Sequence, residues 1–276
     1  MECINFDEQF EQYESEWIHE HAAEYGNSVE RMEEEMPALY EEWLHQPADW
    51  LDGVAPCMYF ERFDDAFMLC EWMEEYFQQN VPVPDLLLDR ITELGEDAER
   101  ALMRILRDET APEEAVLTTI SLLTELESRE PMNLYLQWIL QREKNDDRAD
   151  KAAEALVSMD GEVPAKALEL YDGASDVAQE TLLDVLCNFP GNGKTYELVM
   201  ERFQREKAHI AFFASLLGKL GDERAIPTLT RAMQESGINY FDYIELRNAI
   251  EALGGDAPAE RDFSGDPYYE SLSRMQ

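Results

Sequence analysis

The stretch Leu216-Leu-Gly-Lys-Leu-Gly221, an apolar helix end closed by glycine, recurs along the chain and decides the fold. Its counterparts are Ala155-Leu-Val-Ser-Met-Asp-Gly161, Val185-Leu-Cys-Asn-Phe-Pro-Gly191 and Ala249-Ile-Glu-Ala-Leu-Gly-Gly255. The closing glycines are spaced 30, 30 and 34 residues apart. Such a period is typical of stacked supersecondary units, none of which can bury its apolar face alone. We therefore predict an all-α solenoid of helical hairpins.

Each predicted hairpin has one helix after a glycine and a second helix before the next glycine. Apolar residues recur at helical spacing, as at Leu182, Leu183 and Leu186, which places them on one helix face. Glycine suits the left-handed residue after a helix, and Asp222 or Asp256 suits the following N-cap. The first helices are predicted at 163–171, 196–205 and 225–233, and the second helices at 177–189, 208–220 and 243–253. Helical pattern alone extends the repeat to 86–94, 98–106, 112–126, 132–141 and 149–159.

One repeat carries a recognisable signature, Leu220-Gly-Asp-Glu-Arg-Ala-Ile-Pro-Thr-Leu229 followed by Glu251-Ala-Leu-Gly254. It resembles the short HEAT-like repeat of the phycobilisome-lyase type. The two preceding units match only in period and apolar positions, and Gly-Asn-Gly-Lys at 191–194 replaces the Gly-Asp-x-Arg of that type. The resemblance implies a right-handed α-α superhelix, used mainly for protein binding.

The first 80 residues differ in composition from the rest. They contain four of the five tryptophans and 15 of the 29 aromatic residues. Aromatic stripes at 6–17, 29–43 and 60–77 predict three helices, with Pro37 kinking or restarting the second and Asn27 opening a capping box. We predict a helical cap at 1–80, hairpin repeats at 81–256 and a strap at 257–276. Alternatively, 1–80 is itself the partner-binding head, and the tail with Tyr268, Tyr269 and Leu272 is a docking peptide.

The charge excludes several classes of partner. The chain has 61 Asp and Glu against 22 Lys and Arg, a net charge of −39, and residues 1–80 hold 22 acids against two arginines. Nucleic acids and anionic lipid surfaces are therefore poor partners, because Lys and Arg bind phosphates. No apolar run is long enough to span a membrane. The acidic N-terminus does not resemble a signal peptide, and four scattered cysteines predict no disulfide framework. We expect a cytoplasmic protein.

The sequence contains few candidate metal-binding, phosphate-binding or catalytic residues. Glu16 with His19 and Glu42 with His45 have the spacing of di-iron ligands, but the two pairs lie on consecutive predicted helices, whereas the di-iron arrangement uses alternate ones. Pro190-Gly-Asn-Gly-Lys-Thr195 lacks the first glycine of a phosphate loop and follows a predicted helix instead of a strand. Cys187 lies on a packed apolar stripe. We predict no metal, no cofactor and no catalytic residue.

We therefore expect a non-enzymatic interaction scaffold. Its second helices would form a concave face for a partner protein or a basic peptide, because acidic complementarity speeds association. The candidate contact residues are Tyr240, Tyr243, Glu245 and Arg247. Two alternatives stay open: a lyase or accessory factor, by analogy with phycobilin lyases that share the repeat type, and an acidic nucleic-acid mimic.

Overall fold

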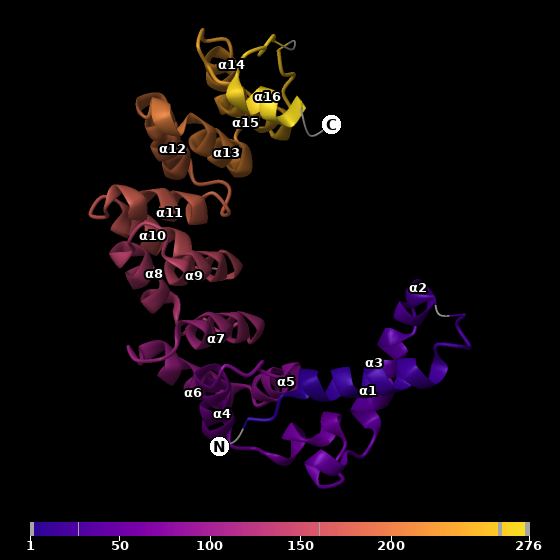
Figure 1. The fold of residues 1–276 in the computed structure, drawn as a ribbon. Helices are drawn as coiled ribbons and strands as arrows, with labels where there is room; N and C mark the ends of the chain where they lie inside the picture. Colours follow the sequence, from indigo (N-terminus) through magenta and orange to yellow (C-terminus); the bar gives the residue numbers. More distant parts are fainter. Residues whose placement is uncertain (1–2, 27, 160, 259–260, 274–276) are drawn as a thin grey trace. The chain divides into compact units, whose positions relative to one another are not determined.

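The chain folds as helices throughout the part that the structure, a computed structural model, describes: residues 3–26, 28–159, 161–258 and 261–273 (Figure 1). Within these residues the β-structure amounts to one isolated bridge between Ala48 and Val54. The predicted all-α class is confirmed, whereas the hand of the superhelix stays a prediction. None of the described helices is both long and apolar enough to cross a membrane. The chain divides into two compact units, Met1–Pro131 and Met132–Gln276.

Unit 1 begins with a helical hairpin and continues through three short 3-10 helices into four packed helices. Their bounds are α1 Phe6–His21, α2 Val29–Glu33, α3 Met36–His45, η1 Asp49–Leu51, η2 Pro56–Met58, η3 Phe60–Arg62, α4 Ala66–Gln79, α5 Asp85–Glu93, α6 Glu96–Arg107 and α7 Glu113–Glu125. The second aromatic stripe is split, and Pro37 lies in the first turn of α3, where proline is tolerated. The predicted cap residue Asn27 lies outside the described residues.

The third aromatic stripe forms a shorter helix than predicted. Its first residues form η3, and α4 begins only at Ala66. The reason is local: the Asp65 carboxylate accepts hydrogen bonds from the backbone N–H groups of Phe67 and Met68, at 3.0 and 3.2 Å, and so caps the helix there.

Helix α4 forms the centre of unit 1. It packs against α5, α6 and α7, and it buries Leu69, Cys70 and Met73 completely. The ring of Tyr76 is also buried, and its hydroxyl donates to the Ile4 carbonyl at 3.0 Å. Helix α4 is the last element of the region predicted as a cap, and it shares one unit with α5 to α7.

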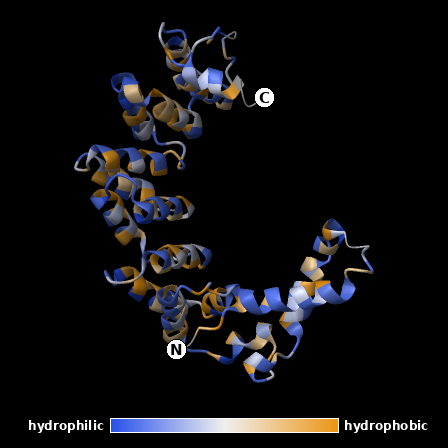
Figure 2. Ribbon diagram, in the orientation of Figure 1, coloured by the Kyte–Doolittle hydropathy of each residue, from blue (hydrophilic) through white to orange (hydrophobic). Residues whose placement is uncertain are grey.

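Unit 2 is a series of hairpins (Figure 1). Its elements are α8 Met132–Gln141, α9 Asp147–Ser158, α10 Val163–Tyr171, α11 Asp176–Leu186, α12 Gly193–Arg205, η4 Lys207–His209, α13 Ile210–Leu220, η5 Glu223–Ala225, α14 Ile226–Met233, α15 Tyr240–Ala252 and α16 Pro267–Ser273. The pairs α8–α9, α10–α11, α12–α13 and α14–α15 pack together, and α9 packs on α11 and α13 on α15. Figure 2 shows hydrophobic and hydrophilic residues on different sides of these helices, as one-sided packing requires.

Glycine turns connect the hairpins much as the repeat predicts. Gly161, Gly191 and Gly221 have left-handed φ angles of 85°, 93° and 75°. In the last unit the left-handed residue is Gly254, with φ 78°, whereas the prediction named Gly255. Gly255 serves packing instead: a Cβ there would lie 3.0 Å from the Ile250 side chain, a contact too short for a methyl group.

Helices α13 and α15 approach each other very closely. A Cβ atom at Gly218 would lie 3.0 Å from Cα and 3.3 Å from Cβ of Ala249. Only a glycine opposite a small residue permits this separation. The close approach packs these two second helices directly against each other.

Candidate functional site

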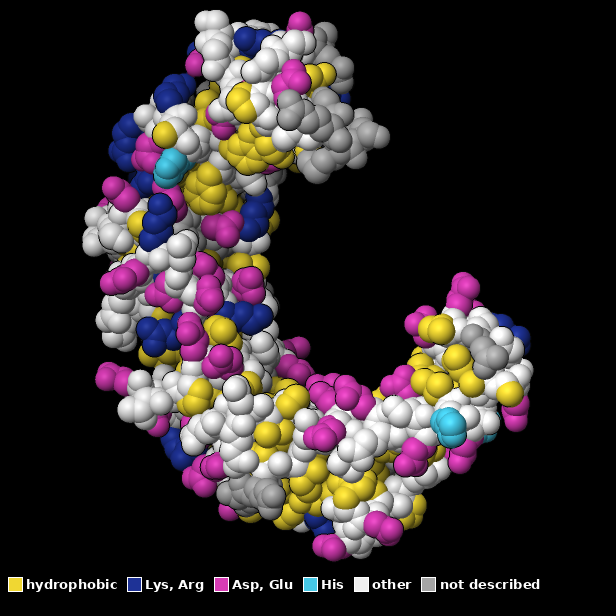
Figure 3. All heavy atoms as spheres, in the orientation of Figure 1, with side chains coloured by type: hydrophobic (Ala, Val, Ile, Leu, Met, Phe, Trp, Pro, Cys, Tyr) yellow, Lys and Arg dark blue, Asp and Glu magenta, His cyan; other side chains and the backbone are white. Residues whose placement is uncertain are grey.

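Three of the second helices of unit 2 line a groove. It has a volume of about 700 Å³ and is formed by α9, α11 and α13, together with Arg142 after α8. Figure 3 shows hydrophobic side chains between charged ones over these helices. A groove of this size with an apolar floor and a few polar groups is a common form of binding site.

The floor is apolar and partly uncovered. Val157 of α9, Val177 of α11 and Phe212 of α13 line the groove, and their side chains are 36%, 38% and 36% exposed. One such residue comes from each of three hairpins, so the floor extends along the row of helices. Isolated exposed apolar residues are ordinary, whereas exposed apolar residues that line one groove are a candidate binding surface.

The walls of the groove are acidic. Four carboxylates and two basic groups line it. Arg142, largely buried, pairs with Asp150 at 2.8 Å and donates to the Thr181 hydroxyl. Lys219 pairs with Asp184 at 2.8 Å. The other two carboxylates, Glu154 and Glu180, pair with Lys151 and Arg202, which lie outside the lining.

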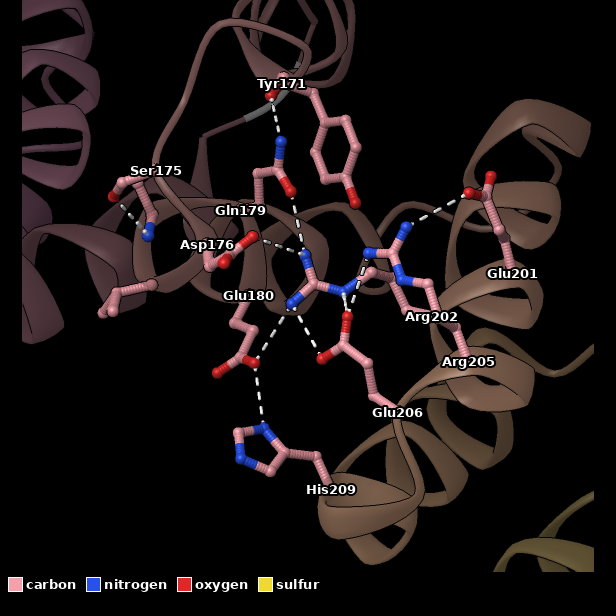
Figure 4. Close-up of polar contacts among 12 residues, drawn as sticks. Tyr171, Ser175, Asp176, Gln179, Glu180, Glu201, Arg202, Arg205, Glu206 and His209 are labelled. Carbon is pink, nitrogen blue, oxygen red and sulfur yellow. Dashed lines mark hydrogen bonds and ion pairs between the residues drawn. The ribbon is translucent and has the colours of Figure 1, made fainter.

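A buried arginine lies behind one wall of the groove (Figure 4). Arg202 of α12 is only 3% exposed, and its guanidinium lies 5.3 Å from the centre of the Phe213 ring. It donates to Gln179 at 2.8 Å, to Glu180 at 3.2 Å and to Glu206 at 3.1 Å. The network joins α12 to α11 and holds Glu180 at the groove.

The ionised form of Glu206 is stabilised by this network. Burial alone would raise the pKa of Glu206, but its hydrogen bonds with Arg205 and Arg202 outweigh burial and lower the pKa. A carboxylate that accepts charged hydrogen bonds is held in its ionised form. The Arg202 network is therefore charged at neutral pH.

The same residues include the group that most resembles a metal site in the described part of the chain. Ligand atoms of Glu180, Glu206 and His209 lie within 4.8 Å of one another, and His209 Nδ1 is 3.0 Å from Glu180 Oε1. However, Arg202 already binds both carboxylates. A divalent cation would have to displace a buried guanidinium, so the geometry fits an ion-pair network better than a metal centre.

The four residues proposed from sequence lie on α15, outside the groove. Tyr243 is buried, with its ring 4.7 Å from the Phe263 ring. Tyr240 packs on Phe263 and Tyr269 at 5.1 and 4.9 Å. Glu245 is half-buried, and Arg247 donates to Glu251 at 2.8 Å. The two tyrosines thus hold the C-terminal segment onto α15.

The sequence analysis did not identify the groove residues, although the sequence contains a signal for one of them. Ile210, Phe213 and Leu217 form the buried stripe of α13, and Phe212 lies outside that spacing. A large aromatic residue off the apolar face of a helix is a candidate for exposure.

The other sequence candidates lie apart or in the interior. The described residues show no group of metal-ligand atoms that contains Glu16 with His19 or Glu42 with His45. Cys187 is buried, and burial raises the pKa of its thiol to about 12, which disfavours the nucleophilic thiolate. Asn192, in the stretch that resembles a phosphate loop, caps α12 by accepting from the Lys194 N–H at 3.0 Å.

No protein-family model matches the chain, and a comparison with curated proteins finds no match either. The resemblance to HEAT-like repeats therefore stays a prediction, and the functional argument depends on the groove and its charges.

Proposed function

We propose that this chain is a non-enzymatic interaction module whose groove in unit 2 binds a segment of a partner protein. The observation that carries the proposal is the uncovered apolar floor of Val157, Val177 and Phe212 within a groove of about 700 Å³. Covering the exposed third of each side chain would contribute roughly 0.5–1 kcal/mol per residue. Three such contacts along one segment give weak but specific binding.

The charges indicate the chemistry of the segment. Four carboxylates and two bases line the groove, and the whole chain has a net charge of −39. A segment with Leu, Val or Phe side chains for the floor and Lys or Arg beside them fits both features. Charge complementarity would also raise its association rate.

A reducing, cytoplasmic setting is in keeping with this function. All four cysteines, Cys3, Cys57, Cys70 and Cys187, are free thiols, and two of them are buried. Structural disulfides are instead typical of oxidising compartments.

The test is a selection of random 16-residue peptides displayed on phage against the intact protein. We expect enriched peptides to combine apolar and basic residues and to bind Phe212→Glu at least tenfold more weakly. The matched control is Phe241→Glu, because Phe241 is an exposed phenylalanine of α15 outside the groove; it should bind these peptides as the wild type does.

Two outcomes would contradict the proposal. In one, every enriched peptide binds the Phe212 and Phe241 variants equally well. In the other, the enriched peptides contain no excess of apolar residues, which would assign their binding to charge alone.

A further inference from the structure

Unit 1 has a cavity of its own at the start of helix α4. It has a volume of about 610 Å³ and is lined by the loop after η3, the first turn of α4 and Asp97 of α6. Phe67 lines it and is 44% exposed, and the half-buried side chains of Phe63 and Met68 extend the apolar lining. The cavity thus offers an uncovered apolar surface of a size that suits a small ligand.

The loop that forms this cavity is held in place by a largely buried arginine. Arg90 of α5 is 13% exposed, and its Nε donates to the Phe63 carbonyl at 3.0 Å. A terminal nitrogen of the same guanidinium lies 2.6 Å from the Asp64 carboxylate. The Phe63 ring packs edge-on against Trp72, with 5.5 Å between the ring centres. A loop fixed by such contacts forms a pre-organised site, which binds a ligand with a smaller loss of conformational entropy.

The cation that lines the cavity is Arg62, whose guanidinium lies against two rings. It is 4.6 Å from the centre of the Tyr59 ring and 5.3 Å from that of the Phe63 ring. Its Nε donates to the Tyr59 carbonyl at 3.0 Å. Its terminal nitrogens have neither a hydrogen bond nor an ion pair with any residue in the described part of the chain. Stacking therefore restricts the side chain, while these N–H donors stay available to a ligand.

The carboxylates that line the same cavity are already engaged. Asp64 and Asp97 pair with arginines of α5 and α6. Asp65 accepts hydrogen bonds from two backbone N–H groups in the first turn of α4, where the positive end of the helix dipole favours an anion. Among the described residues, the charged group of this cavity without a charged partner or a cap to form is therefore the guanidinium of Arg62.

We propose that this cavity binds a monocarboxylate with an apolar body, with the carboxylate on the terminal nitrogens of Arg62 and the body against Phe67 and Met68. Arginine binds a carboxylate through two parallel hydrogen bonds, which fix the orientation of the ligand. A dianion such as a phosphate monoester fits less well, because the carboxylates of the lining repel a second negative charge. A small organic acid has this chemistry, and so does the end of a polypeptide whose last residue is apolar. The site is independent of the groove in unit 2.

The test is nuclear magnetic resonance of the intact protein, isotope-labelled in its methionine methyl groups. Met68 lines the cavity and serves as the local reporter, with its signal assigned through Met68→Leu. The probes are phenylbutyrate and its neutral amide, titrated separately. We expect both to shift the Met68 signal and the acid to bind about fivefold more tightly, because only the acid forms charge-assisted hydrogen bonds with the guanidinium.

Two variants separate the charge from the apolar contact. Arg62→Gln should remove the preference for the acid and leave amide binding unchanged, which also shows that the cavity is intact. Phe67→Ala should weaken the binding of both probes about threefold, because both lose the same apolar contact. The matched control is Arg107→Gln, which removes an equal charge at an exposed residue of α6 outside the cavity. The acid should bind this control within about twofold of the wild type.

Several outcomes would overturn the proposal. They are a Met68 signal that no probe shifts, equal affinity of the wild type for the acid and the amide, and equal loss of acid binding from Arg62→Gln and Arg107→Gln. Tighter binding of phenylbutylamine than of phenylbutyrate would do the same, because it would assign the site to the carboxylates of the lining.

A peptide with the same chemistry distinguishes the two sources of the ligand. Acetyl-Ala-Ala-Phe with a free terminal carboxylate is titrated beside phenylbutyrate. Tighter binding of the peptide supports the end of a polypeptide as the ligand, and weaker binding supports a small organic acid. In either case Arg62→Gln should weaken the binding of the peptide more than Arg107→Gln does.

Discussion

Replacing Arg202 with methionine tests the network behind the groove. Removing one partner of a buried ion pair costs about 3–5 kcal/mol, because the remaining charge is left without a partner. Here Glu180 and Glu206 are 25% and 24% exposed, so water recovers part of their solvation. Gln179 also loses a hydrogen bond of 2.8 Å, worth about 1 kcal/mol, while methionine keeps apolar contact with Phe213. We expect a net loss of about 2–4 kcal/mol.

The free energy of unfolding would be measured by urea titration with circular dichroism at 222 nm. Hydrogen exchange with mass spectrometry would locate the loss, which should appear in α11 to α13 and spare α5 and α6. The control is Arg205→Met, three residues further along the same helix. Arg205 is 57% exposed, and it pairs with Glu201 at 3.5 Å and Glu206 at 3.0 Å, so its replacement should cost less than about 1 kcal/mol.

The pH dependence of the free energy of unfolding tests the same network, because the direction of the pKa shift of Glu206 predicts the direction of the change. The lowered pKa of Glu206 means that its ionised form is favoured in the folded protein. Its stabilisation is therefore complete above about pH 4.3, the ordinary pKa of glutamate, and is lost as the pH falls through the lower folded value. The difference between the wild type and Arg202→Met should be constant from pH 7 to 5 and shrink below that range. Equal stability of the Arg202 and Arg205 variants at pH 7 would refute the reasoning.

Three further changes test the packing. Tyr76→Phe removes the hydrogen bond to the Ile4 carbonyl at 3.0 Å and should cost about 1 kcal/mol in urea unfolding. Gly218→Val places a side chain against Ala249, where even a Cβ would be 3.0 Å from Cα; overpacking should lower the melting temperature through a loss of about 1–3 kcal/mol. The pKa of Asp266 is lowered by hydrogen bonds from the backbone N–H groups of α15 and α16. Asp266→Asn should therefore speed hydrogen exchange in α16 at pH 7, and acidification through that lowered pKa should do the same in the wild type.

The positions of the helices follow from local sequence. Helices α8 and α10 have the predicted bounds, and α5, α6, α7 and α9 lie within a few residues of theirs. Helical periodicity, glycine turns and caps involve residues only a few positions apart, so a short window contains the whole signal. Even the late start of α4 depends on Asp65, its immediate neighbour.

The exposure and pairing of the residues at the candidate site depend on residues far apart in the chain. Tyr243 is buried because Phe263 covers it, and Arg202 is neutralised by Glu180, which lies 22 residues earlier. Phe212 and Phe213 are neighbours, yet one is 36% exposed at the groove and the other is buried. Sequence determined the helices because their hydrogen bonds and caps are local. Only the tertiary structure decided which side chains stay uncovered, since exposure is set by whichever distant helix packs against them.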